Sequence, residues 1–158
     1  MAYKPASKTV KREILMPRFD GEGEEEKVGF TIIFKRPDRK SVKAYRDGIK
    51  AEQKRLTDLF KENEKAPENA VEVDVQEAIE AIQVDYMKQR IAGWADVQVI
   101  NGDGGLSSEF NGPNLDVFLT DIDVMSAVLE DHRKLTQGYR EEAAKNSSTS
   151  GDTGQLVA

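Results

Sequence analysis

The first 36 positions contain two apolar segments that are typical of β-strands, with a polar segment between them. Residues 10–16 are rich in β-capable side chains, although their apolar and polar positions do not alternate cleanly. Residues 28–36 hold β-branched and aromatic side chains and end at Pro37. Residues 18–27 combine glycines with a run of glutamates, which favours a solvated turn. We therefore predict an antiparallel hairpin with a long tip, in which Pro17 ends the first strand.

A helical period follows over residues 42–60. Apolar side chains recur there at steps of three, four and seven residues, which places them on one face of a helix. Asp38 or Ser41 can cap the start of this helix, and residues 65–69 end it. The apolar stripe is Val42, Tyr45, Ile49, Leu56, Leu59 and Phe60.

A second helix is predicted from Val75 to about Ile91, with Asp74 as its N-cap and Gly93 as its terminator. Its apolar stripe comprises Val75, Ala78, Ile79, Ile82 and Tyr86. Residues 83–94 also allow an extended segment, because Ile82, Val84 and Tyr86 alternate with polar positions. Both interpretations stay open for this stretch.

The C-terminal third begins with a strand-like piece at residues 94–100, followed by a glycine-rich turn at 101–105. Residues 106–110 can return from that turn. A short helix over Leu115–Leu119 is then capped by residues 112–114. A last helix starts at Thr120-Asp121, and its apolar stripe is Ile122, Met125, Val128, Leu129, His132, Leu135 and Tyr139.

These elements predict an α+β fold that is mainly helical, with an N-terminal β-hairpin packed on a helical body. The length of 158 residues suits one domain. We expect a flexible N-terminus over residues 1–9, a single globular domain over 10–145, and a disordered tail over 146–158. The tail is rich in Gly, Ser and Thr, a composition that forms no packed core.

Composition limits the kinds of site and partner that the chain can have. The chain has no Cys and one His, which excludes disulfides, cysteine nucleophiles and multi-histidine metal sites. The net charge of −6 argues against nucleic acid as a partner. No apolar run approaches the roughly 20 residues that a membrane span needs, and the N-terminus lacks the apolar core of a secretion signal. We expect no membrane partner, no cofactor, no metal and no catalytic residue, and a reducing, cytosolic environment.

Four candidate sites each have a structural explanation that we favour. Residues 20–26 could hold a hard cation, but they lack the spaced ligands of a calcium loop. Residues 101–105 resemble a phosphate loop without its Lys-Ser/Thr. His132 could act as a base, yet it lies in register with an apolar stripe. The carboxylates at a predicted helix start fit capping better than acid–base chemistry; they are Asp116, Asp121 and Asp123.

The strongest electrostatic feature is a basic face on the first helix. It could dock an acidic helix or a nucleic-acid backbone, and we favour a solvated or protein-binding surface. The face comprises Arg36, Arg39, Lys40, Lys43, Arg46, Lys50, Lys54 and Arg55. Trp94, the only tryptophan, suits either the core or an interface.

Several segments in one order resemble the tail assembly chaperones of long-tailed bacteriophages. They include Ile91-Ala92-Gly93-Trp94, the glycine-rich turn at 101–105, Leu106 to Phe110, and a final helix with Tyr139 that closes on Lys145-Asn146. Phe34-Lys35-Arg36-Pro37 followed by Tyr45 also fits this pattern. The resemblance spans about residues 28–146.

The resemblance implies an assembly factor without catalytic activity. Such proteins coat the tape measure protein before the tail tube polymerises around it, and they leave before the particle is complete. In many such phages a −1 ribosomal frameshift near the C-terminus adds a domain that recruits tail tube subunits. The implied partners are therefore the tape measure protein and the tail tube protein, in the host cytoplasm, with homo-oligomers left open.

Physical reasoning indicates which residues such a chaperone would use. A groove formed by amphipathic helices can hold a partner helix, and many weak contacts along a repeated partner add up by avidity. The interface candidates are Tyr45, Ile49, Leu56, Trp94, Val128, Leu135 and Tyr139. The rival functions are a structural tail tube or head–tail connector protein that remains in the virion, a small metal-dependent hydrolase, and a nucleic-acid regulator that uses the basic face.

Overall fold

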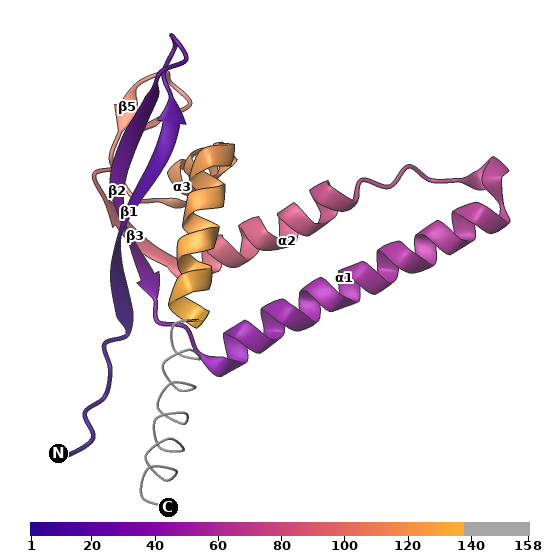
Figure 1. Cartoon of the computed structure of the whole chain (residues 1–158), viewed down its shortest axis with the longest axis horizontal. Helices are drawn as coiled ribbons and strands as arrows, with labels where there is room; N and C mark the ends of the chain where they lie inside the picture. The colour runs from indigo at the N-terminus through magenta and orange to yellow at the C-terminus, as the bar shows by residue number, and fades with distance from the viewer. Residues whose placement is uncertain (138–158) are drawn as a thin grey trace, which may run out of the picture.

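A computed structural model describes residues 1–137 and shows a compact head from which a two-helix arm projects (Figure 1). The predicted α+β, mainly helical fold with an N-terminal hairpin is confirmed. The tail expected over 146–158 and the domain end expected at 145 lie outside the described residues. Residues 1–8 form neither helix nor strand.

The head and the arm alternate along the chain. The arm consists of α1 (Arg39–Lys65), the short 3₁₀ helix η1 (Pro67–Asn69) and α2 (Val75–Arg90). The head contains the remaining elements: β1 (Thr9–Phe19), β2 (Glu25–Lys35), β3 (Ile91–Ala95), β4 (Val99–Ile100), β5 (Leu106–Ser107), α3 (Gly112–Thr120) and a last helix that starts at residue 122 and is described to residue 137. The arm is thus an insertion between the second and third strands of the sheet.

The hairpin is longer and its turn tighter than the sequence predicts. β1 and β2 pair from Thr9 and Lys35 to Phe19 and Glu25, so half of the predicted loop at 18–27 is strand and residues 20–24 form the turn. The Asp20 carboxylate accepts hydrogen bonds from the backbone N–H groups of Glu22 and Glu24, both at 2.9 Å, which satisfies the turn internally. Pro17 lies inside β1 because this is an edge strand, where proline can be tolerated.

The sheet has a third strand that was not predicted as such. α2 ends at Arg90, and β3 begins at once and pairs antiparallel with β2, which gives the strand order β1-β2-β3. The prediction that Gly93 terminates the helix is therefore wrong, because Gly93 lies opposite Ile33 in the ladder. Pairing with a buried strand outweighs the local helical pattern, and the extended alternative holds for residues 91–94.

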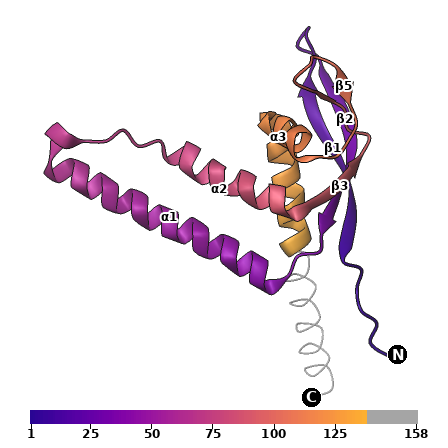
Figure 2. The same cartoon turned by 180° about the vertical axis from the view of Figure 1, so that it is seen from behind.

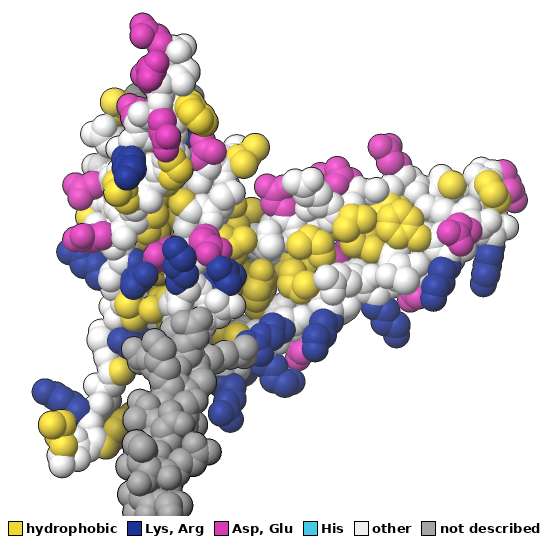
Figure 3. All heavy atoms as spheres, in the orientation of Figure 1, with side chains coloured by type: hydrophobic (Ala, Val, Ile, Leu, Met, Phe, Trp, Pro, Cys, Tyr) yellow, Lys and Arg dark blue, Asp and Glu magenta, His cyan; other side chains and the backbone are white. Residues whose placement is uncertain are grey.

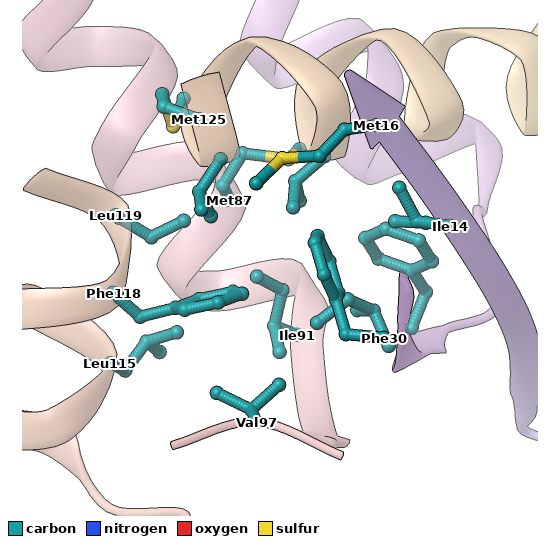
Figure 4. Close-up of a cluster of buried hydrophobic side chains, with 14 of the residues drawn as sticks. Ile14, Met16, Phe30, Met87, Ile91, Val97, Leu115, Phe118, Leu119 and Met125 are labelled. Atoms are coloured by element: carbon teal, nitrogen blue, oxygen red, sulfur yellow. The ribbon is translucent and has the colours of Figure 1, made fainter. Parts of the chain in front are cut away.

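One face of the sheet packs on the helices and forms the core of the head (Figure 4). Alternate residues of β1 and β2 point inward, as a half-buried strand requires. Phe30 and Phe118 meet edge to face with ring centroids 5.4 Å apart. The buried cluster comprises Ile14, Met16, Phe30, Ile32, Phe34, Tyr86, Met87, Ile91, Val97, Val99, Leu115, Phe118, Leu119, Val124, Met125 and Val128.

The two arm helices lie side by side and antiparallel (Figures 1 and 2). α1 has 27 residues, which corresponds to about 40 Å at 1.5 Å per residue. The predicted cap Asp74 is confirmed, because it accepts from the Glu77 N–H at 3.0 Å. Of the two candidates for the first helix, Asp38 is the cap and accepts from the Ser41 N–H at 2.8 Å. At the far end, the Asn63 side chain exchanges two hydrogen bonds with the backbone of Val71, at 2.8 and 3.0 Å, which fixes the return of the chain.

The last two helices start at asparagine and aspartate caps. α3 begins at Gly112 and is capped by Asn111, which accepts from the Asn114 N–H at 2.9 Å, so the predicted cap at 112–114 was placed too late. The last helix is capped by Asp121, which accepts from the Val124 N–H at 3.3 Å, as the capping interpretation predicts. Within residues 1–137, no helix is both long and apolar enough to span a bilayer.

Candidate partner-binding site on the arm

A groove lies at the base of the arm, where α1, α2 and the last helix meet. We call it the base groove, and its volume is about 950 Å³. α1 supplies one wall with Val42, Tyr45 and Arg46, α2 contributes Gln83 and Tyr86, and the last helix closes the other side. The groove exists because the two arm helices leave the head on one side of the last helix.

Stacked aromatic rings form the floor of the base groove. The rings of Tyr45 and Tyr86 stack with centroids 4.1 Å apart and an interplanar angle of 11°. Burial raises the pKa of both tyrosines, although a hydrogen bond between Tyr45 and Gln83 opposes the rise for Tyr45. The floor therefore offers neutral, largely apolar ring surface to an occupant.

His132 lies beneath this floor and belongs to the packing of the head. Its side chain is 2% exposed and meets Tyr86 and Phe34 edge to face, at 5.3 and 5.2 Å. Burial, assisted by the nearby positive charge of Arg90, lowers the pKa of His132 to about 4. Among the described residues its Nε2 atom has no hydrogen-bond partner. The ring borders the base groove, but with so little of its surface exposed a neutral imidazole suits packing.

Arg90 joins the end of α2 to the start of α1, where both helices of the arm meet the head. Its guanidinium donates to the carbonyl of Arg36 at 2.9 Å and to the Ser41 hydroxyl at 3.1 Å, and it lies 3.6 Å from the Asp38 carboxylate. The side chain is buried although it is charged. The sequence pattern gives no sign of this role, because Arg90 looks like a favourable charge in the last turn of α2.

The walls of the base groove are positively charged although the whole chain is acidic. Five Lys or Arg residues and two Asp residues line the groove, whereas the chain carries a net charge of −6. Lys43 pairs with Asp47 at 3.2 Å. Arg39, Arg46 and Lys50 have no ion-pair partner within residues 1–137. An occupant that carries carboxylates would complement these three cations.

Outward from the groove, an apolar seam runs between α1 and α2. Ile49, Leu59, Ile79 and Ile82 are half-buried there, and only Leu56 is fully buried. Phe60 is 45% exposed. Figure 3 shows hydrophobic side chains along this face of the arm, with Lys and Arg along one edge and acidic side chains along the other. The two helices thus cover only part of each other's apolar stripe.

The arm candidates differ in how accessible they are. Tyr45 lines the base groove, and Ile49 lies on the seam just beyond it. Leu56 is 4% exposed, because it packs between the two helices. A partner can contact Tyr45 and Ile49 directly, whereas Leu56 supports the surface from below.

The head candidates are mostly packing residues. Val128 is fully buried in the core, which corrects its assignment to a partner surface. Leu135 is half-buried and packs against the core cluster. The Trp94 ring meets Phe110 and Phe118 edge to face, and its Nε1 donates to the Ser108 carbonyl at 2.9 Å, which agrees with the core interpretation. Tyr139 lies outside the described residues.

The remaining candidate sites have local explanations. Residues 20–24 form the hairpin turn, and Asn101 caps the glycine-rich turn by accepting from the Gly105 N–H at 3.1 Å. Asp116 does not cap a helix but pairs with Lys88 at 2.6 Å and so joins α3 to α2. In the described part of the chain, no group of three or more His, Cys, Asp or Glu side chains is arranged to hold a metal ion.

The structure adds residues that the sequence did not single out. Tyr86 and Gln83 complete the floor of the base groove, and Phe60 and Val75 are exposed towards the outer end of the arm. Tyr86, Phe60 and Val75 belong to the predicted apolar stripes, whereas the polar Gln83 does not, and periodicity does not show which part of a stripe stays uncovered. Comparisons with protein-family models, with curated proteins and with solved structures give no match.

Proposed function

We propose that this protein is a phage tail assembly chaperone without catalytic activity. It binds the tape measure protein, keeps it soluble in the host cytoplasm, and helps to recruit tail tube subunits before it leaves the particle. The observation that carries the proposal is the arm, whose apolar seam is only half-covered by its own two helices. A partner helix laid along this face would complete a three-helix bundle.

The proposal fits the physical demands of holding a long helical protein. A tape measure that is amphipathic along its length exposes apolar surface and aggregates when it is bare. A helix that lies in a groove buries that surface and can be released again. Many copies that each bind weakly along one repeated partner together give a firm grip through avidity. The arm, about 40 Å long, offers room for several helical turns per copy.

Co-expression tests the proposal. The chain is produced together with the longest coiled-coil-like protein encoded near it, and we expect recovery of a soluble complex. Phe60→Glu, which places a charge on the exposed seam, is expected to reduce that recovery severalfold. The matched control is Leu106→Glu, because Leu106 is 69% exposed on the head and the charge change is the same. A candidate partner that stays insoluble with and without the chain would overturn the proposal.

The second candidate function is a structural tail tube or head–tail connector protein that remains in the virion. The observation that favours it is the three-stranded sheet with the 11-residue strand β1 at its edge, since such edges pair with strands of other subunits. Mass spectrometry of purified particles separates the two functions. Stoichiometric amounts of the chain in finished virions would support the structural role, and its absence there would support the chaperone.

A further inference from the structure

We propose that the base groove binds an amphipathic helix whose flank facing α1 is acidic. This inference rests on the proposed function and deepens it, because it names the chemistry by which the arm selects a segment of its partner. The argument uses the shape of the groove, the apolar floor and the placement of charge on the arm.

The floor and the walls of the groove complement different kinds of side chain. The half-buried Val42 and Tyr45 offer apolar and ring surface, which suits the hydrophobic stripe of a helix, and the buried Tyr86 supports Tyr45 by stacking on it. Arg39, Arg46 and Lys50 stand on the α1 side without an ion-pair partner among the described residues. Glutamates on one flank of a docked helix would lie beside these cations while its stripe covers the tyrosines.

The basic row continues outward along α1. Lys43, Arg46, Lys50, Lys54 and Lys61 are spaced by three, four, four and seven residues, so they share one flank of the helix. Three of them line the groove, which shows that this flank faces it. Glu77 and Glu80 are exposed on α2 across the seam. The groove-side flank of α1 is thus mainly basic, although Asp47 pairs with Lys43 there, and a partner helix with carboxylates beside this flank complements it.

A second copy of this chain that packs its arm antiparallel on this face fits poorly. A twofold axis that packs two arms face to face in opposite directions keeps each helix over its own counterpart. The basic row of α1 would then meet the same row of the other copy, and like charges in contact are destabilising. Nucleic acid would use the cations but leave the apolar floor uncovered, and the acidic edge of α2 would repel it. The charge pattern therefore favours a different protein chain with an acidic flank.

The test uses two synthetic peptides of 21 residues with the same Leu and Ile positions at helical spacing. One peptide carries Glu at the flanking positions and the other carries Lys. Fluorescence anisotropy at low salt is expected to show that the full chain binds the Glu peptide at least tenfold more tightly. Raising the NaCl concentration should weaken the binding of the Glu peptide more than that of the Lys peptide.

Two triple variants with equal net charge locate the effect. Arg39→Glu, Arg46→Glu and Lys50→Glu together should remove or reverse the preference for the Glu peptide. Lys11→Glu, Lys27→Glu and Lys35→Glu change exposed residues of the sheet by the same charge and should retain most of it. Circular dichroism and melting temperature check that both variants fold. If the groove variant fails to fold, the salt dependence of Glu-peptide binding and the single variant Lys50→Glu test whether these cations set the preference.

Several results would overturn the inference. Equal affinity for both peptides, or an equal loss of the preference in both triple variants, would show that the groove does not select its occupant by charge. Tighter binding of duplex DNA that is lost in the groove variant would assign the site to nucleic acid. A dimer that light scattering detects for the wild type but not for the groove variant would assign the groove to a second copy.

The two proposals fail in different experiments. If the Glu peptide binds as expected but no tape measure is solubilised on co-expression, the groove chemistry stands and the chaperone function is wrong. If a tape measure is solubilised but the peptides bind equally, the chaperone function stands and the acidic-flank inference is wrong.

Discussion

The head and the arm use the same kind of amphipathic pattern and reach different outcomes. In the head, apolar faces of three strands, α3 and the last helix close on one another, and side chains such as Phe34 and Val128 are fully buried. In the arm, two helices pack mainly on each other, and Leu56 is the one hydrophobic residue among those described there that is buried away from the core cluster. An apolar stripe becomes core only where enough layers surround it, and elsewhere it remains a surface.

This difference predicts unequal stability. Helices gain most of their stability from the apolar face that they bury, and the arm buries less per residue than the head. Regions with few buried apolar contacts open locally at a lower free energy than the whole domain. We therefore expect hydrogen exchange in the outer part of α1 and α2 to be faster than in β2 and the last helix.

The largest effect is expected from Phe34→Ala in the head. Phe34 is fully buried and meets His132 edge to face, so the substitution leaves a cavity in close-packed surroundings. We expect a loss of about 4 kcal/mol in the free energy of unfolding, measured by urea denaturation. The matched arm variant Ile49→Ala should cost much less, because Ile49 is half-buried. Equal losses would show that the arm is packed as tightly as the head.

The second prediction concerns acid. Burial holds the pKa of His132 at about 4, below its ordinary 6.5, so the unfolded chain binds this proton first as the pH falls. The stability that this difference provides is complete above pH 6.5 and is lost between about pH 6.5 and 4, to a total of about 3 kcal/mol.

The comparison of the wild type with His132→Phe isolates this contribution. Carboxylates titrate alike in both proteins, so the difference in unfolding free energy between them should change with pH over that window. A difference that stays constant from pH 7 to pH 4 would contradict the burial of a neutral histidine.

A third, smaller effect separates the two regions directly. Leu56→Ala removes the buried contact of the arm and should cost about 2 kcal/mol, at the lower end for such substitutions because the seam can relax. Hydrogen exchange should speed up in α1 and α2 and change little in β1 and β2. Uniform acceleration over both regions would mean that the arm and the head unfold as one unit.

The sequence was most informative where period and caps agreed. The stripe from Val42 to Phe60 and the caps Asp38 and Asp74 located the arm helices closely. The pattern could not show that Ile91 to Ala95 leave the helix, because pairing with β2 is a contact between distant residues. It likewise placed the end of β1 too early, since the tolerance for Pro17 depends on β1 being an edge strand.

The candidate site was only partly accessible to sequence reasoning. The helical period selects Tyr45 and Val128 equally, yet one lines a groove and the other is sealed in the core. Which stripe is covered depends on the number of neighbouring elements, and that is a property of the tertiary arrangement. The basic flank of α1 was visible as a charge pattern, whereas its position beside the groove required the structure.

The smallest predicted effect tests the outer arm through its cap. Asp74 accepts from the Glu77 N–H at 3.0 Å at the start of α2. Asp74→Ala should cost about 1 kcal/mol, because a backbone donor at the helix start loses its acceptor. For a chain of this size that corresponds to a lower melting temperature by about 2–4 °C.

Asp103→Ala is the control for that cap variant, because it removes the same charge from an exposed turn of the head. It should leave the melting temperature nearly unchanged. Asp74→Ala should also raise hydrogen exchange in α2 more than in β1 and β2. An exchange pattern that Asp74→Ala leaves untouched would show that packing on α1, and not the cap, holds the start of α2.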